Sequence, residues 1–298
     1  MTSDGQADVA TETFVAHRNL LFTVVYQMLS SATDAEDVLQ ETWLRWVRVD
    51  LDTVRDQRAY LVRIATNQAL TRLRTLGRRK ESYIGSWLPE PLLTVPDVAD
   101  DVELADSVSI AMLLVMETLT PTERAVFVLR EVFGLDYDEI AQAVDKSSPA
   151  VRQIAHRARS HVAARRPRGV ASRTEAKAAL AAFQRAIETG DLQGLLDILA
   201  PDVVVVADGG GVKQAVPRPI VGADKVARVL TSGLDRVRAR MAVEPANVNG
   251  GPALIVRLDG EIDGVLAVRV EERRVSGIYY VRNPEKLSWL NEAMAFSR

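Results

Sequence analysis

Residues 119–159 read LTPTERAVFVLREVFGLDYDEIAQAVDKSSPAVRQIAHRAR, and this stretch decides the fold of its part of the chain. The residues TPTE at 120–123 supply an N-cap, a proline at the first helical position and a capping acid, so a helix starts there and stops at Gly134. Asp136 opens a short second helix, and after a turn Ser148 caps a longer helix. A short helix, a tight turn and a longer basic helix predict a helix-turn-helix.

The longer helix is amphipathic, with apolar residues at helical spacing on one side. Its other side carries side chains that can reach base edges and phosphates in the major groove, namely Arg152, Gln153, His156, Arg157 and Arg159. Helical hairpins with basic outer faces are common in proteins of other functions. A solvated helix face therefore stays open as the alternative at this point.

Charge is segregated along the chain, although the formal total is only -3. Residues 55–80 contain eight lysines and arginines against one acid, and residues 146–168 contain seven against none. Two basic stretches on separate helical segments favour a polyanionic partner, because neutralising phosphates releases their counterions and drives nucleic-acid binding. The sequence therefore predicts nucleic acid as a partner.

The first 80 residues have the apolar periodicity of three helices. Thr33 followed by Glu36 has the pattern of a capping box at the start of the second helix, whose outer face is acidic. The third helix, from about residue 58 to 79, buries a leucine-rich side and aligns polar residues at steps of three or four. We expect this part of the chain to be entirely α-helical.

Residues 81–106 interrupt the helical pattern with prolines, the sequence WLPEP at 87–91 and an acidic run from Asp97 to Asp106. This composition predicts a linker. Trp87 and Leu88 are too apolar for a passive tether, so we expect the linker to dock onto a domain.

The last 130 residues have a different pattern, with an alanine-rich helix to about residue 189, a second at 192–199 and then short apolar runs bounded by glycine and proline. This order predicts an α+β domain. The expected strands are 203–207, 214–216, 241–248, 252–258, 262–270 and 275–282, with a helix near 223–234. Asp259-Gly260 and Asp263-Gly264 are expected to form turns.

Several classes of function are excluded or disfavoured by composition. The 298 residues include no cysteine and three histidines, which removes thiol chemistry and leaves few ligands for a transition metal. We expect no metal and no cofactor. The apolar runs are too short to span a membrane, and the acidic first thirteen residues do not resemble a secretory signal, so a cytoplasmic location is expected.

The segments 34–48 (DAEDVLQETWLRWVR), 58–80 (RAYLVRIATNQALTRLRTLGRRK) and 119–159 together resemble regions 2 and 4 of an extracytoplasmic-function sigma factor. WLPEP, the sequence DGGG at 208–211 and NPEKL at 283–287 further resemble the SigJ-type subgroup, which carries a fused C-terminal SnoaL-like domain. Val212 separates the glycines from Lys213, whereas the subgroup usually has a lysine directly after them.

The resemblance implies a multidomain fold and its boundaries. Two all-α sigma domains, region 2 at 8–80 and a region 4 helix-turn-helix at 107–168, would flank the linker 81–106 and precede an α+β SnoaL-like (NTF2-like) cone at 171–290. The chain would bind core RNA polymerase and direct promoter recognition and transcription initiation. It would not be an enzyme, and no membrane would be involved.

The resemblance also implies a role for particular residues. Those facing the clamp helices of the polymerase beta-prime subunit would be Asp37, Gln40, Glu41 and Arg45, and region 4 would meet the beta flap. The residues that hold the minus-10 element would be Arg58, Arg63, Asn67, Arg74 and Arg78. The residues that read the minus-35 element would be Lys146, Ser148, Arg152, Gln153, His156, Arg157 and Arg159.

Within the resembled subgroup the C-terminal domain acts as a built-in regulator of the sigma core. The expected interdomain contact consists of Trp87, Leu88, Pro89, Glu90, Pro91, Asp208, Gly209, Gly210, Gly211, Asn283, Pro284, Lys286 and Leu287. A small ligand in the pocket of the cone is a further expectation.

Two other functions remain as alternatives. A one-component regulator would use the helix-turn-helix to report a small ligand bound by the C-terminal domain, but the basic helix at 58–80 argues against it. A SnoaL-like cyclase or isomerase would use Asp208 as a general base, yet no second catalytic group accompanies it and the DGGG stretch fits a tight loop equally well.

Overall fold

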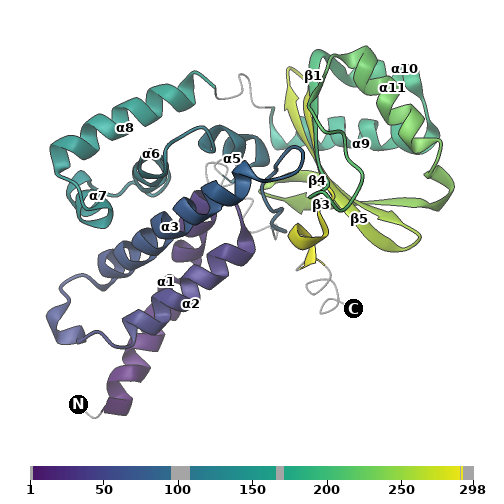
Figure 1. Ribbon diagram of the computed structural model, residues 1–298. Coiled ribbons are helices and arrows are strands. Elements are labelled where there is room, and N and C mark those ends of the chain that lie inside the picture. The colour runs from purple at the N-terminus through teal and green to yellow at the C-terminus, as the bar shows by residue number, and fades with distance from the viewer. Residues whose placement is uncertain (1–2, 95–107, 166–170, 289, 291–298) are drawn as a thin grey trace. The chain divides into compact units, whose positions relative to one another are not determined.

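The computed structural model describes residues 3–94, 108–165, 171–288 and 290, and does not describe the side chains of residues 3–7 and 78–79. The chain forms two compact units (Figure 1). The helical unit consists of Met1–Glu81 and Val115–Arg166, and the sheet unit consists of Ser82–Leu114 and Pro167–Arg298. The segments resembling regions 2 and 4 thus share one unit, whereas the linker belongs with the C-terminal domain. The acidic run of the linker lies outside the described residues.

The helical unit contains two groups of helices. The first group is α1 (Ser3–Leu29), α2 (Ala32–Trp46), the short η1 (Leu51–Thr53) and α3 (Gln57–Glu81). The second group is α6 (Pro121–Phe127), its π-helical continuation η3 (Val128–Val132), α7 (Tyr137–Val144) and α8 (Ser148–Ala163). Helices α1, α2 and α3 pack on one another, and both α6 and α7 pack on α3. The expected all-α fold of these segments is confirmed.

Capping residues define where these helices begin. The capping boxes at Thr120 and Asp136 are confirmed. The box at Thr33 is wrong: Ser31 has extended backbone and its hydroxyl accepts from the Asp34 N–H at 3.0 Å, because the chain already enters the helix there after the left-handed Ser30. The expected cap of α8 at Ser148 is also wrong, because the hydroxyl of Ser147 accepts from the Ala150 N–H and caps the helix one residue earlier.

Glu117 lies between two cations of the helical unit. Its carboxylate accepts from the Arg124 guanidinium at 2.7 Å and from the Lys80 ammonium. Burial alone would raise the pKa of the Glu117 carboxyl, but Arg124 and Lys80 outweigh it and lower this pKa to about 2. The ionised carboxylate therefore stabilises the folded unit.

We expect acid to weaken the helical unit through Glu117. Because the folded pKa is about 2 and the ordinary value is 4.5, the unfolded chain takes up the proton first, and the stabilisation present above pH 4.5 is lost as the pH falls towards 2. Urea unfolding followed by far-UV circular dichroism should show a shallower decline between these pH values for Glu117→Gln than for the unaltered chain. Parallel pH profiles would contradict this expectation.

The sheet unit contains one six-stranded sheet in the order β2-β1-β6-β5-β4-β3. Its strands are β1 (Leu199–Asp208), β2 (Ile220–Val221), β3 (Met241–Val248), β4 (Gly251–Leu258), β5 (Glu261–Glu271) and β6 (Arg274–Val281). Its helices are α9 (Arg173–Thr189), α10 (Leu192–Ile198), α11 (Ala223–Leu234) and the short η4 (Arg238–Arg240) and η5 (Pro284–Lys286), and α5 (Ile110–Met116) begins in the linker segment. Strands β1 and β6 pair in parallel, and the other neighbours are antiparallel.

Two predictions about the strands are wrong. Residues 214–216 form no strand, and the two-residue β2 pairs with β1 instead. Asp259-Gly260 forms the expected turn with both residues left-handed, but Asp263-Gly264 lies inside β5. Gly264 is required there for a different reason: an added Cβ would lie 2.6 Å from the carbonyl oxygen of Val281 on β6.

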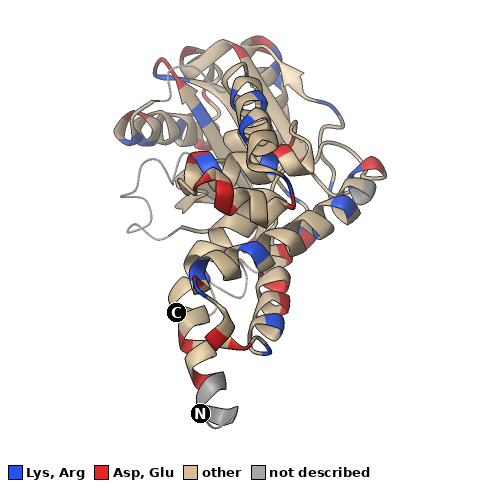
Figure 2. Ribbon diagram, turned by 90° about the vertical axis from the view of Figure 1, so that its left-hand side faces the viewer, with Lys and Arg blue, Asp and Glu red and all other residues tan. Residues whose placement is uncertain are grey.

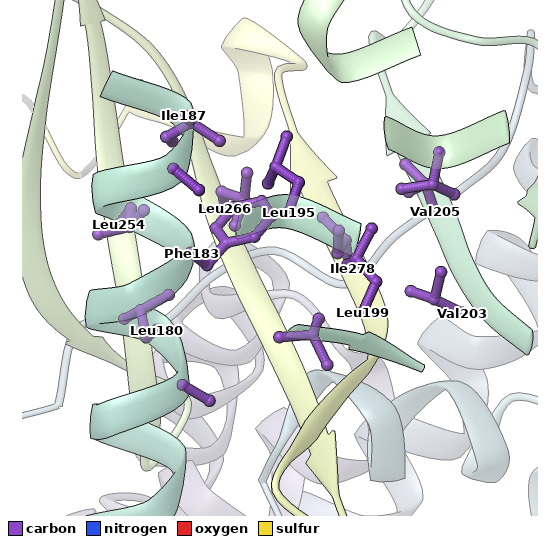
Figure 3. Packing of buried hydrophobic residues seen from close by; sticks show 14 of the residues in the cluster. Leu180, Phe183, Ile187, Leu195, Leu199, Val203, Val205, Leu254, Leu266 and Ile278 are labelled. Carbon is purple, nitrogen blue, oxygen red and sulfur yellow. The ribbon is translucent and has the colours of Figure 1, made fainter. Parts of the chain in front are cut away.

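Both faces of the sheet are buried, which explains the continuous apolar runs in its strands. One face packs under α9, α10 and α11, and Figure 3 shows Phe183, Leu195 and Leu266 meeting in this core. On the other face, Leu88 of the linker, Ile110 of α5 and Leu287 after β6 pack against strand residues such as Val265 and Tyr279. The linker thus supplies part of the hydrophobic core of the sheet unit.

Candidate functional site

Helix α8 presents a polar face formed by three of the predicted residues. Arg152, Gln153 and His156 are exposed, while Val151 and Ile154 on the opposite side are buried. The turn before α8 is closed by Asp145, which has a left-handed backbone with φ of 52°. Arg152 and Gln153 lie in the N-terminal half of the helix, and His156 lies at its middle. The N-terminal part of a recognition helix is the part that meets base edges.

The other predicted residues of this segment are engaged to different extents. Arg159 pairs with Glu131 at 2.7 Å, and Arg157 lies 3.9 Å from Glu123. Ser148 donates a hydrogen bond to Asp138 of α7, and Lys146 is exposed in the turn. The pair with Glu131, which was not predicted, links α8 to the π-helical η3.

Helix α3 carries the second basic face. Arg58, Asn67 and Arg74 are exposed, and the half-buried Arg63 lies over the ring of Tyr60 at 4.4 Å from its centroid. The side chain of Arg78 lies outside the described residues. Tyr60 was not predicted, although an aromatic ring beside cations is the combination that binds single-stranded bases by stacking.

Helix α2 carries the predicted acidic face, and Figure 2 shows how acidic and basic residues are distributed over the helices. The predicted residues Asp37, Gln40, Glu41 and Arg45 are all exposed. Leu44, which was not predicted, is 44% exposed among them and adds an apolar contact point. The face is not fully open, because Asp37 pairs with Arg72 of α3 at 2.8 Å and Glu41 accepts from Gln68 at 2.9 Å.

In the sheet unit, Asp208 at the end of β1 holds the linker. Its carboxylate is fully buried and accepts from the Tyr83 hydroxyl at 2.5 Å and the Leu88 N–H at 2.9 Å. It also accepts from the Gly210 N–H at 3.0 Å and from Lys286 at 2.7 Å. Burial and the hydrogen bond to Asp208 raise the pKa of the Tyr83 phenol, so this hydroxyl stays a donor. One carboxylate therefore joins two stretches of the linker segment to the sheet.

Lys286 of the NPEKL sequence completes this contact from the other side. Its ammonium donates to the Leu88 carbonyl at 2.6 Å and lies 4.2 Å from the centre of the Trp87 ring. Asn283 donates from its side-chain amide to the Tyr83 hydroxyl at 2.8 Å. The linker-docking site is defined here as Tyr83, Trp87, Leu88, Asp208, Asn283 and Lys286.

The remaining residues of the expected contact surround this site. Pro89, Glu90, Pro91 and Leu287 are buried, whereas Pro284 is exposed. The glycines after Asp208 are required by close approach: a Cβ on Gly209 would lie 2.0 Å from the Lys213 carbonyl oxygen, and one on Gly210, which has φ of 63°, would lie 2.4 Å from Asn283. WLPEP, DGGG and NPEKL are therefore brought together within the sheet unit.

A second anchor for the linker was not predicted. The Leu92 N–H and carbonyl bond to the side-chain oxygen and the N–H of Asn249, at 3.0 and 2.8 Å, and Leu93 pairs with Val248 of β3. The Asn249 side-chain amide also donates to the Val108 carbonyl at 2.9 Å. Asn-Gly at 249–250 is a common hairpin turn, but no local pattern shows that its asparagine binds a segment about 150 residues earlier.

Lys213 has a defined partner in the sheet unit. Its ammonium donates to the Asp263 carbonyl at 2.9 Å and lies 3.2 Å from the Asp263 carboxylate. Asp263 also accepts from Tyr280 and Arg282, which lower the pKa of its carboxyl against the effect of burial. Lys213 thus fastens the loop after DGGG to β5 and does not join the linker-docking site.

The geometry bears on chemistry as well. Asp208 is fully buried and accepts four hydrogen bonds, which does not suit a general base that must reach a substrate.

A hollow of about 340 Å³ lies elsewhere, between Lys177 and Gln184 of α9 and Asn247 of β3. Among the described residues no cluster of three or more histidines, acids or cysteines is placed to hold a metal ion. The described helices are all too short or too polar to cross a membrane.

Comparison with known proteins identifies the helical unit. Residues 13–79 match the family model for sigma-70 region 2, and residues 109–162 match that for sigma-70, region 4. The chain is 32% identical over 290 residues to the ECF RNA polymerase sigma factor SigJ of Mycobacterium tuberculosis, covering 92% of each protein. The chain belongs to the ECF RNA polymerase sigma factors.

Two further similarities extend over most of the chain. It is 30% identical over 285 residues to the probable ECF RNA polymerase sigma factor SigI of Mycobacterium tuberculosis, covering 95% of this chain and 96% of the relative. The crystal structure of Mycobacterium tuberculosis SigJ superposes with a TM-score of 0.75 and 29% identity, covering 93% of this chain and 98% of that one. The expected fold class, helical sigma domains followed by an α+β domain of the SnoaL-like type, is confirmed.

The family assignment carries the main function. Regions 2 and 4 of this sigma factor serve promoter recognition and transcription initiation, and ECF sigma factors bind core RNA polymerase and promoter DNA. Its sigma-factor relatives are not enzymes. The helix-turn-helix prediction and the prediction of a nucleic-acid partner are thereby confirmed.

Proposed function

We propose that the sheet unit restrains the activity of this sigma factor by holding the linker that joins regions 2 and 4. The observation that carries the proposal is the buried Asp208 carboxylate, which accepts hydrogen bonds from Tyr83 and Leu88 of the linker segment. The match to region 2 ends at residue 79 and the match to region 4 begins at residue 109, and the described residues from 82 to 108 belong to the sheet unit. The linker therefore cannot lengthen while it stays docked.

The physical effect concerns the distance that the linker can span between regions 2 and 4. A fully extended linker of about 29 residues, between the matches to regions 2 and 4, spans up to about 95 Å, at about 3.3 Å per residue. Promoter elements centred near positions minus-10 and minus-35 are about 25 base pairs apart, which is about 85 Å of duplex at about 34 Å per ten base pairs. Docking of residues 83–94 removes much of that adjustable length, so undocking favours simultaneous contact with both elements.

Within this proposal each exposed face has one partner. The face of α3 with Arg58, Arg63, Asn67 and Arg74 holds the minus-10 element, with Tyr60 as a stacking surface. The face of α8 with Arg152, Gln153 and His156 reads the minus-35 element. The face of α2 around Asp37 and Glu41 binds the clamp helices of the beta-prime subunit, region 4 meets the beta flap, and all of these contacts are made in the cytoplasm.

Run-off transcription with core RNA polymerase tests the proposal. Lys286→Met keeps the length of the side chain but removes the charge that bonds Asp208 and Leu88, so we expect the transcript yield at limiting sigma factor to rise about three- to tenfold, equivalent to about 0.7–1.4 kcal/mol. Lys225→Met on the exposed surface of α11 is the matched control and should leave the yield unchanged.

The outcomes separate the parts of the proposal. An unchanged or lower yield for Lys286→Met would contradict restraint by the docked linker. If the unaltered chain bound duplex DNA but not core polymerase, the assignment of α2 to the clamp helices would be wrong, and a one-component regulator would take its place. A small ligand would then be sought in the hollow beside α9.

A further inference from the structure

A charged side chain is buried where region 4 packs on region 2 in the helical unit. Arg124 of α6 is 2% exposed. Its guanidinium donates to the Gln27 carbonyl at 2.9 Å and to the Ser30 hydroxyl at 2.5 Å, both at the end of α1. Its third nitrogen donates to Glu117 at 2.7 Å. One residue of region 4 therefore bonds directly to the backbone and a side chain of region 2.

The position of these acceptors explains why an arginine fits. Helix α1 ends at Leu29, so the Gln27 carbonyl lies in its last turn, where backbone carbonyls point out of the helix end. Ser30 turns the chain away with a left-handed backbone, φ 57°. A cation at the C-terminus of a helix is favoured by the helix dipole. Arg124 thus acts as the cap of α1, supplied by a different region of the protein.

Glu117 extends the contact to the end of α3. Its carboxylate bonds both Arg124 and Lys80, and Lys80 lies in the last turn of the helix that carries the proposed minus-10 face. Together, Lys80, Glu117, Arg124, Gln27 and Ser30 form a network that ties region 4 to the C-terminal ends of α1 and α3 in region 2. We name these five residues the latch.

A contact of this kind is suited to opening. Burying an ion pair strips water from both charges, and this desolvation costs much of the free energy that their attraction gains. The net stabilisation is therefore small, although the geometry is specific. When the regions separate, Arg124, Glu117 and Lys80 regain their hydration. The closed packing can therefore be reversed by a competing partner without unfolding either region.

The size of the helical unit makes opening necessary on a promoter. A compact unit of about 130 residues has a radius of gyration of about 14 Å. The two promoter elements lie about 85 Å apart along the duplex. We propose that Arg124 closes region 4 onto region 2 in the free sigma factor, and that this latch opens when both promoter elements are bound. The proposal rests on the proposed assignment of α3 and α8 to separate elements.

Distance measurement between two spin labels tests the latch in the full chain. The protein contains no cysteine, so Ala16→Cys on α1 and Gln142→Cys on α7 give one labelled pair, both exposed and outside the proposed DNA faces. In the free protein we expect a single short distance. Binding of core polymerase with promoter DNA should lengthen it by at least about 20 Å, given the separation of the elements.

Variants of the latch should open the free protein. Arg124→Gln removes the charge, and Ser30→Gly removes one acceptor while suiting the left-handed backbone, so it does not disturb the turn. We expect Arg124→Gln to move most of the free population to longer distances and Ser30→Gly to move part of it. Arg18→Gln, which removes an exposed ion pair with Glu36 inside region 2, is the matched control and should change nothing.

Each outcome has a definite meaning. If Arg124→Gln and Ser30→Gly are folded by circular dichroism yet keep the distance of the unaltered chain, Arg124 is not a latch. If the short distance persists in the complex with both elements protected from cleavage, the opening step is wrong. If the unaltered chain does not bind core polymerase but Arg124→Gln still lengthens the free distance, the proposed function fails and the latch remains.

Discussion

Asp208→Asn is expected to destabilise the sheet unit by about 3–5 kcal/mol, the cost typical of removing one partner from a buried ion pair. The carboxylate accepts from four donors, and an amide would turn its NH₂ group towards some of them. Lys286, whose side chain is 12% exposed, would keep its charge without its anion. Both effects act on the contact that holds the linker.

Hydrogen exchange gives a site-specific measurement of this effect. The Leu88 N–H donates to Asp208, so its exchange should accelerate strongly in Asp208→Asn, together with a lower midpoint of urea unfolding. The matched control is Asp202→Asn, the same change at an exposed position of the same strand. Equal exchange rates at Leu88 in the two variants would show that Asp208 does not hold the linker.

Charge reversal on either DNA face is the second prediction with a large effect. Arg74→Glu in α3 and Arg152→Glu in α8 each place a negative charge where a phosphate or base edge is proposed to lie. Like charges brought together cost several kcal/mol, and about 1.4 kcal/mol corresponds to a factor of ten. We expect each reversal to lower the yield of open promoter complexes about 100-fold, measured by permanganate reactivity of the melted strand.

The control for this experiment is Arg185→Glu, an exposed arginine of α9 in the sheet unit, which should leave the yield within a factor of about two, since exposed charges remote from DNA contribute little. Binding should also depend less steeply on salt concentration in the two reversed variants, because fewer counterions are released. Open complexes that survive either reversal unchanged would refute the assignment of that face.

Prediction from sequence succeeded where the signal is local. The capping boxes at Thr120 and Asp136 join residues three apart, and the polar stripe of α3 repeats every three or four residues, so neighbouring side chains alone decide these features. It was less accurate where two local choices are nearly equal. Ser31 and Thr33 both suit an N-cap, and Asp-Gly at 263–264 forms a strand because β6 approaches the glycine closely.

The candidate site divides in the same way. The exposure of Arg152, Gln153 and His156 follows from an amphipathic helix and was predictable. The pair between Arg159 and Glu131 and the latch at Arg124 were not, because residues 28 and 97 apart meet there. A basic residue in a capped helix is expected to face solvent, and only a packed neighbouring helix end gives it buried acceptors.

The sequence by itself determined the helices, the capping boxes at Thr120 and Asp136 and the helix-turn-helix, and it marked WLPEP, DGGG and NPEKL as motifs, since all of these are short-range patterns. The tertiary structure decided that these three sequences form one site, with Tyr83 bonded to Asp208 across 125 residues, and that the linker completes a face of the sheet. The physical reason is that a buried charge needs partners from wherever the chain closes around it, and chain closure over such distances leaves no local pattern.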